Sequence, residues 1–362
     1  MDKMSLRWYD GFAVAGFFML PTLFFTAPSV LVGESAGAAW ISVLVAHLLV
    51  MLVFLILSAA VRAEPGGDLI TVARRVLGGC LGRIFGGLLS VYFLVSTGLW
   101  VREGAEVFGV YGLSLTPVYI VGGLILAAAV AMNFFGGRAT IKTVGIFILI
   151  IMFGVVAILL LGLNRYNPDY IFPSLGFGWG SIFSGGLYAA GIVEGVVVLA
   201  LLAPDFSGTA IRRAGLGAIA VSAVLSSAFY LGFVMIFSPS VASGMTSGFM
   251  EMGKSIYYNR FFYRFESVLL FLLVFSSVLT AGLGLFFARR SAAITLGVER
   301  PRTLTIILAL IIFAISCLPQ SLGELTTVYL GLLRRHSIYF MAGMSVVILL
   351  AGKLRGVARR GR

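Results

Sequence analysis

The stretch GGLYAAGIVEG, residues 185–195, lies inside a long apolar segment and contains one acidic residue, Glu194. Four of its eleven residues are glycine, which loses more backbone freedom in a helix than any other residue. In a membrane, non-helical backbone is tolerated only where it is buried in protein or lines a cavity. If the segment spans a membrane, the stretch therefore predicts a broken helix beside a cavity.

The composition places the surrounding chain in a membrane. Hydrophobic residues make up 60% of the 362 residues and charged residues only 11%, whereas soluble domains have roughly 25% charged residues. A helix that crosses the hydrocarbon core needs roughly 20 apolar residues, so the chain has room for about ten spans. We therefore expect an all-α integral membrane protein.

Apolar windows bounded by charged or turn residues predict ten spans. The expected spans are 9–31, 40–61, 83–101, 117–135, 142–163, 181–202, 215–237, 265–287, 303–318 and 337–351. The first lacks a small-residue cleavage site and is expected to be retained. Residues 66–82 are apolar on one face only and predict an interfacial helix. The connection over 238–264 is the best candidate for a lid or a loop that faces a partner.

The basic residues predict the orientation. With the N-terminus inside, 19 of the 26 lysines and arginines fall on the cytoplasmic side. Cytoplasmic loops of membrane proteins carry such an excess, so both termini are expected inside. The net charge of +12 then faces anionic membrane lipids rather than nucleic acid.

A second interruption occurs in the first span. Pro21 removes a helical hydrogen bond there, and Gly16 lies shortly before it. The two interruptions are five spans apart, as expected for two five-helix halves of opposite topology with a binding site between their broken helices. We expect one transmembrane domain over 1–362, with repeats at about 9–163 and 181–351 and a basic tail at 352–362. Taken singly, either interruption is equally consistent with a simple kink.

Glu194 lies close to the middle of the sixth span. An ionisable residue at that depth is a functional hypothesis by default, here for holding a proton or facing a ligand amine. The alternative is a neutral carboxyl that is hydrogen-bonded to a neighbouring helix.

Several other polar side chains are candidates for the same site. Tyr92 and Ser96 lie on one face of the third span, and Ser276, Ser277 and Thr280 cluster in the eighth. Such hydroxyls also bond to their own backbone or join helices. His47 is expected to form an interhelical hydrogen bond, and Arg264 is expected to pair with Glu266 or a neighbouring loop.

Enzyme signatures are missing from the sequence. It has no phosphate-binding Gly-Lys motif, no metal-ligand cluster and no nucleophile elbow. We therefore expect neither catalysis nor a cofactor nor a metal.

Scattered residues along the chain resemble a known family in their order and spacing. They are Pro21, Trp40, Glu64-Pro65-Gly66, residues 76–79, Leu81-Gly82, Tyr92-Phe93-Leu94, Glu194, Pro204 and Arg264-Phe265-Glu266. The chain resembles the spore germination permease family, the B-type subunits of nutrient germinant receptors, within the amino acid–polyamine–organocation superfamily. It departs from the family in lacking a tryptophan in span eight and a Tyr-Pro pair before it.

The resemblance implies a LeuT-like 5+5 inverted repeat with spans one and six broken. Carried over to this sequence, the binding pocket comprises Gly16, Tyr92, Ser96, Tyr188, Ala189 and Ser277, and the breaks add Pro21 and Gly191. The implied ligand is a small amino acid such as L-alanine. The implied partners are an A-type membrane subunit and a C-type lipoprotein in the spore inner membrane.

Two functions fit these expectations. In the first, which the resemblance favours, the protein senses a germinant and signals through its partners. In the second, it is a secondary amino acid transporter coupled to protons or sodium, with Glu194, Ser276 and Thr280 as candidates for the coupling site.

Overall fold

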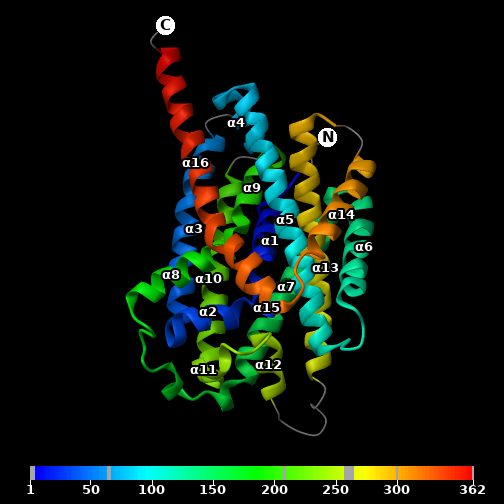
Figure 1. The fold of residues 1–362 in the computed structure, drawn as a ribbon. Helices are drawn as coiled ribbons and strands as arrows, with labels where there is room; N and C mark the ends of the chain where they lie inside the picture. The colour runs from blue at the N-terminus through cyan, green and yellow to red at the C-terminus, as the bar shows by residue number, and fades with distance from the viewer. Residues whose placement is uncertain (1–4, 63–66, 207–208, 257–264, 299–300, 361–362) are drawn as a thin grey trace.

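The computed structural model describes residues 5–62, 67–206, 209–256, 265–298 and 301–360, without the side chains of Glu194, Phe265, Glu266, Pro301 and 353–360. The described part is almost entirely helical. Its one isolated β-bridge joins Leu6 to Phe206. Figure 1 shows an elongated bundle of long helices that surrounds shorter broken ones.

The first span is broken, as predicted. It consists of α1 (Trp8–Met19), the 3₁₀ turn η1 (Leu20–Phe24) and α2 (Ala27–Ser35). Pro21 lies at the start of η1, where a helical turn has unpaired N–H groups and the lack of one in proline is tolerated.

Five helices follow in the first half, after the short turn η2 (Ala36–Ala38). They are α3 (Ala39–Arg62), α4 (Leu69–Leu77), α5 (Gly79–Tyr111), α6 (Val118–Phe134) and α7 (Gly137–Leu161). The amphipathic α4 lies within the residues 66–82 that were predicted to form an interfacial helix, whereas residues 79–82 belong to α5. The location of α4 at a membrane interface stays a prediction. The prediction for the third span was too short, because α5 extends ten residues beyond position 101.

The sixth span is also broken. It begins with α8 (Trp179–Ala190), and residues 191–193 are not helical. The short segments η5 (Glu194–Val197), α9 (Val198–Leu201) and η6 (Ala203–Asp205) follow. Two 3₁₀ turns, η3 (Leu163–Arg165) and η4 (Pro168–Ile171), connect this span to the first half.

The remaining chain forms three long helices and several short ones. They are α10 (Ala210–Ile236), α11 (Pro239–Ala242), α12 (Gly248–Ser255), α13 (Phe265–Leu296), α14 (Pro301–Ser316), α15 (Leu322–Glu324), the π-helical turn η8 (Leu325–Tyr329) and α16 (Leu330–Arg360). In Figure 1 the start of α1, α4 and the end of α16 lie at the upper end of the bundle, and α11 and α12 lie at the lower end.

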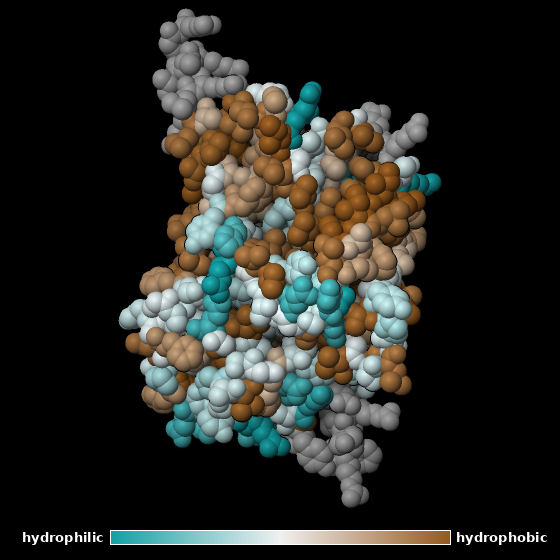
Figure 2. Space-filling model, viewed as in Figure 1, coloured by the Kyte–Doolittle hydropathy of each residue, from teal (hydrophilic) through white to brown (hydrophobic). Residues whose placement is uncertain are grey.

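Helix length and surface character agree with a membrane location. Among the described residues, seven helices are long and apolar enough to cross a membrane, and Val118–Phe134 and Arg302–Ser316 are shorter apolar helices. Large hydrophobic side chains such as Leu52, Leu124 and Phe153 are exposed on the outside. Figure 2 shows that hydrophobic residues cover much of the upper half of the face in view. The count of ten spans stays a prediction.

Close contacts between the halves hold the centre together. Helix α5 packs along α13, and α1 packs against η5 and α10. The interhelical hydrogen bond predicted for His47 is confirmed, because its Nε2 lies 3.0 Å from the hydroxyl of Ser222 on α10.

Candidate functional site

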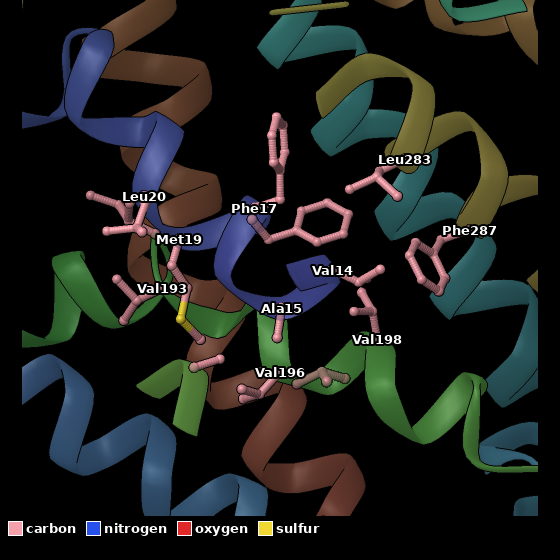
Figure 3. Packing of buried hydrophobic residues seen from close by; sticks show 14 of the residues in the cluster. Val14, Ala15, Phe17, Met19, Leu20, Val193, Val196, Val198, Leu283 and Phe287 are labelled. Carbon is pink, nitrogen blue, oxygen red and sulfur yellow. The ribbon is translucent and has the colours of Figure 1, made fainter. Parts of the chain in front are cut away.

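The two breaks meet at the centre of the bundle. Figure 3 shows Val14, Ala15 and Met19 of α1 packed near Val193, Val196 and Val198 of the sixth span. Glycine is required for this approach, because a Cβ on Gly195 would overlap the Cβ of Phe18 and lie 3.0 Å from the carbonyl oxygen of Ala15. The glycine-rich stretch therefore lets the two broken spans touch.

A small cavity of about 20 Å³ lies beside the breaks. Its wall is mostly aromatic and aliphatic and is formed by Phe18, Tyr92, Phe93, Trp100, Gly191, Ile192, Gly195, Val197, Val198 and Met341. A space of this size holds about one water molecule. The cavity is therefore nearly filled by its own walls, and a ligand larger than a water molecule requires these walls to separate.

One stripe of α5 faces this region. Tyr92, Ser96, Trp100 and Glu103 follow one another at helical spacing, so they lie on the same face. Tyr92 stacks on Phe340 of α16 with ring centroids 6.0 Å apart. The predicted pair of Tyr92 and Ser96 is therefore part of a longer stripe that ends in an acid.

Glu103 is the centre of a buried polar network. Its carboxylate accepts a 2.8 Å hydrogen bond from Arg334 of α16, and it accepts bonds from the backbone N–H (3.2 Å) and the hydroxyl of Thr26, beside the first break. Arg334 also donates to the hydroxyl of Tyr188 on α8, at 3.1 Å. All four residues are at most 3% exposed. The network therefore connects both broken spans to α5 and α16.

Sequence reasoning missed Glu103 and Arg334. The predicted third span ended at 101 and the predicted last span began at 337, so both residues were assigned to loops. The structure places them inside α5 and α16. The signal that was available is the spacing, because Glu103 lies seven residues after Ser96 and so on the same helical face.

A second buried ion pair joins α13 to η6. Arg290 donates to Asp205 of η6 at 2.7 Å and to the carbonyl of Leu201 at 3.1 Å. Asp205 in turn accepts a backbone hydrogen bond from Leu6, ahead of α1. Ser277 packs on Gly104 beside Glu103, and Arg290 lies thirteen residues later, or about 20 Å along the helix axis. The two ion pairs therefore close opposite ends of the central region.

Three predicted hydroxyls are buried without a hydrogen-bond partner among the described side chains: Ser96, Ser276 and Thr280. Ser276 and Thr280 share a helical face with Phe287, whose ring packs 5.8 Å from that of Phe18 in α1. These two hydroxyls therefore lie on the side of α13 toward the first break. Ser277 instead donates to the carbonyl of Leu273, at 2.8 Å.

The other predicted residues lie at varying distances from the cavity. Gly191 lines it, whereas Gly16 faces Ile148 of α7. Pro21 and Ala189 are buried at the two breaks. The side chain of Glu194 is outside the described part of the structure, as is the Arg264–Glu266 pairing. The described residues contain no cluster of three or more His, Cys, Asp or Glu side chains that could hold a metal.

The connection after α10 covers one end of the site. The hydroxyl of Ser247, which caps α12, donates a 2.7 Å hydrogen bond to the carbonyl of Phe24 at the first break. The rings of Phe249 and Phe24 pack with centroids 4.1 Å apart. The described part of this predicted lid is thus tied directly to the broken first span.

Comparison with known families identifies the chain. A family model described as "Spore germination protein" matches residues 10–324, nearly the whole length. The chain belongs to the spore germination protein family. No curated protein matches this spore germination protein closely enough in sequence to add a function.

Solved structures similar to this spore germination protein include Mhp1 and MhsT. One is Mhp1, a nucleobase-cation-symport-1 family transporter, in a closed conformation with bromovinylhydantoin bound; the TM-score is 0.63 with 14% identity over 97% of this chain and 93% of Mhp1. The other is MhsT in complex with L-phenylalanine, with a TM-score of 0.65 and 12% identity over 97% of this chain and 100% of MhsT. The similarity confirms the predicted LeuT-type transporter fold.

Proposed function

We propose that this membrane protein is the B-type subunit of a nutrient germinant receptor. In this function it binds a small amino acid such as L-alanine at the breaks of spans one and six. Binding is then transmitted to an A-type membrane subunit and a C-type lipoprotein in the spore inner membrane. Membership of the family supports the receptor function, and the single structural observation that carries the pocket is the meeting of the two breaks between two buried ion pairs.

The chemistry of the region suits an amino acid. Broken helices leave backbone N–H and carbonyl groups that suit a carboxylate and an ammonium group, and the non-helical residues 191–193 supply such groups. The aromatic wall around Tyr92 and Trp100 suits an apolar side chain. Of the predicted ligand contacts, Tyr92 and Gly191 line the cavity. The proposal requires Gly16, Pro21, Ser96, Tyr188, Ala189 and Ser277 to reach the ligand when the cavity widens. Because the cavity is small, ligand access requires one of the ion pairs to open.

The alternative is a secondary amino acid transporter. The hydroxyls of Ser276 and Thr280 have no hydrogen-bond partner among the described residues. This favours the transporter, since hydroxyls and carbonyls freed at a helix break are ligands for a coupling cation. Glu194 is the corresponding candidate for protons. If protons drive uptake through this residue, Glu194→Gln should abolish the pH dependence of uptake.

Binding to the purified protein tests the pocket. Radiolabelled L-alanine should bind saturably to protein in nanodiscs, and Trp100→Ala should shift preference toward larger amino acids by enlarging the cavity. Trp179→Ala is the matched control, because Trp179 is 60% exposed at the start of α8 and does not line the cavity. Absence of saturable binding by any of the common amino acids would contradict the proposal.

Transport measurements separate the two functions. Protein reconstituted alone in liposomes should show no uptake of L-alanine driven by a proton or sodium gradient if it is a sensor. Gradient-driven accumulation would establish the transporter instead. Co-purification of A-type and C-type subunits with the tagged protein from spores tests the proposed complex.

A further inference from the structure

A second cavity opens beside the buried network but on its outer side. It has a volume of about 420 Å³ and lies between α2, α8 and the start of α16. Ligand pockets for small molecules begin at roughly 300 Å³, so this groove has room for an amino acid in the present conformation, unlike the central cavity. Its lining residues include Val30, Glu34, Tyr188, Thr327, Leu332 and Arg335.

The groove carries one positive and one negative side chain. Arg335 and Glu34 form an ion pair across it, with side chains 50% and 21% exposed. Ion pairs with this degree of exposure contribute little to stability, because water screens them. A ligand that carries both charges can therefore separate the pair at little cost and give each side chain a new partner.

The backbone of the last span shapes this groove. The π-helical turn η8 immediately precedes α16, and such turns occur frequently at functional sites. Gly331 and Arg335 are four residues apart and line the groove from the same side. Gly331 contributes no side chain to this wall, and a Cβ there would lie 3.2 Å from the carbonyl oxygen of Thr326.

Tyr188 separates the groove from the buried network. It lines the groove, yet it is only 1% exposed, and its hydroxyl accepts a hydrogen bond from Arg334. Arg334 in turn holds Glu103. An occupant of the groove would thus contact the residue next to the ion pair that must open for access to the centre.

We propose that the groove is a second binding site, which takes the zwitterion of a small α-amino acid. The carboxylate binds Arg335, the ammonium group binds Glu34, and the apolar side chain lies against Val30 and Leu332. The class of ligand rests on the proposed function, whereas the site rests on the cavity and its two opposite charges. The site holds an amino acid in front of the closed Glu103–Arg334 pair.

Binding stoichiometry tests the proposal. Equilibrium binding of radiolabelled L-alanine to purified protein in nanodiscs should give two sites per chain. Both Arg335→Gln and Glu34→Gln should weaken one site about tenfold or more, as expected for loss of a charge-assisted hydrogen bond, and leave the other unchanged. Arg165→Gln is the matched control, because Arg165 is an exposed arginine in η3, outside the groove.

A labelling experiment reports on the groove directly. In a variant in which Cys80 and Cys317 are replaced by serine, Thr327→Cys should react with a charged methanethiosulfonate reagent more slowly in the presence of L-alanine. Ethylamine and propionate, which each carry one of the two charges, should protect it less. Ser240→Cys, on an exposed position of α11, is the control and should not be protected.

The outcomes distinguish this inference from the proposed function. One site per chain that is unaffected by Arg335→Gln, together with unprotected Thr327→Cys, would overturn the second site and leave the central pocket standing. No saturable binding in the unmodified protein would overturn both. Two sites, of which one is lost in Arg335→Gln, would support both.

Discussion

At the scale of single residues, the Glu103–Arg334 ion pair is buried, so loss of either partner has a large effect on stability. A buried ion pair recovers its desolvation cost only through good geometry and further hydrogen bonds, which Thr26 and Tyr188 supply here. The pair is therefore stable when intact and unstable when only one partner is removed. Such an ion pair suits a gate to the proposed central site that is either fully closed or fully open.

Glu103→Gln should destabilise the protein by about 3–5 kcal/mol, because it leaves the Arg334 guanidinium buried without its counter-charge. Combining it with Arg334→Met should recover much of this loss. Thermal unfolding of the purified variants in detergent measures both effects. The control is Lys254→Gln, which breaks the more exposed Lys254–Glu251 pair of α12 and should cost no more than about 1 kcal/mol. Equal losses at both positions would contradict the account.

At the scale of helices, the glycines at the second break are explained by close packing. A Cβ on Gly191 would overlap the carbonyl oxygen of Arg334 and lie 2.5 Å from the hydroxyl of Ser337 in α16. Glycine at position 191 therefore allows the break in span six to pack directly against α16. Sequence reasoning identified the break, but it gave no indication of this partner.

Gly191→Ala should destabilise the protein by about 1–3 kcal/mol, as expected for overpacking, and should also lower affinity at the central site. Gly180→Ala is the matched control, because a Cβ there meets open space; in helix α8 alanine should be neutral or slightly stabilising. Melting temperature and amino acid binding check the two effects. A tolerated Gly191→Ala would mean that the contact with α16 is not required.

The connection between α12 and the first break makes a separate prediction. Ser247→Ala should cost about 1–3 kcal/mol, because it removes the partner of the buried Phe24 carbonyl, and it should speed hydrogen exchange in η1 as well as in α12. The control is Ser321→Ala. The hydroxyl of Ser321 caps α15 by accepting a hydrogen bond from the backbone N–H of Glu324, and its removal should leave exchange in η1 unchanged. Faster exchange confined to α12 would argue against coupling between the lid and the break.

At the scale of the whole molecule, two buried ion pairs close the central cavity from opposite ends. The Glu103–Arg334 pair lies toward α11 and α12, and the Asp205–Arg290 pair ties η6 to the far part of α13. With both formed, the cavity has room for about one water molecule. The cavity is therefore too small for an amino acid, and ligand access to the proposed central site requires at least one pair to open.

The two pairs should control access from opposite sides. With Met341→Cys as a cavity reporter and Cys80 and Cys317 replaced, Glu103→Gln should increase labelling from the side that carries α11 and α12. Asp205→Asn should increase labelling from the other side. Membrane-impermeant maleimides applied to oriented vesicles measure this, with Glu106→Gln as the control. Increased labelling from the same side in both variants would refute the assignment of the pairs to opposite ends.

The sequence by itself determined the class of the protein and the position of its breaks. Apolar windows require helices in lipid, and Pro21 and the glycines of 185–195 interrupt those helices through local backbone effects. Tyr92 and Ser96 were identified as one face because helical spacing is a local property. The family resemblance was confirmed by the match over residues 10–324.

Only the tertiary structure decided which charges are buried and paired. Glu103 and Arg334 are 231 residues apart in the chain, and Asp205 and Arg290 are 85 apart. A charged residue normally marks the end of an apolar window, so all four were placed in loops or at span ends. A charge can remain inside a span only when folding brings a partner to it, and that partner is a long-range contact which no local pattern records.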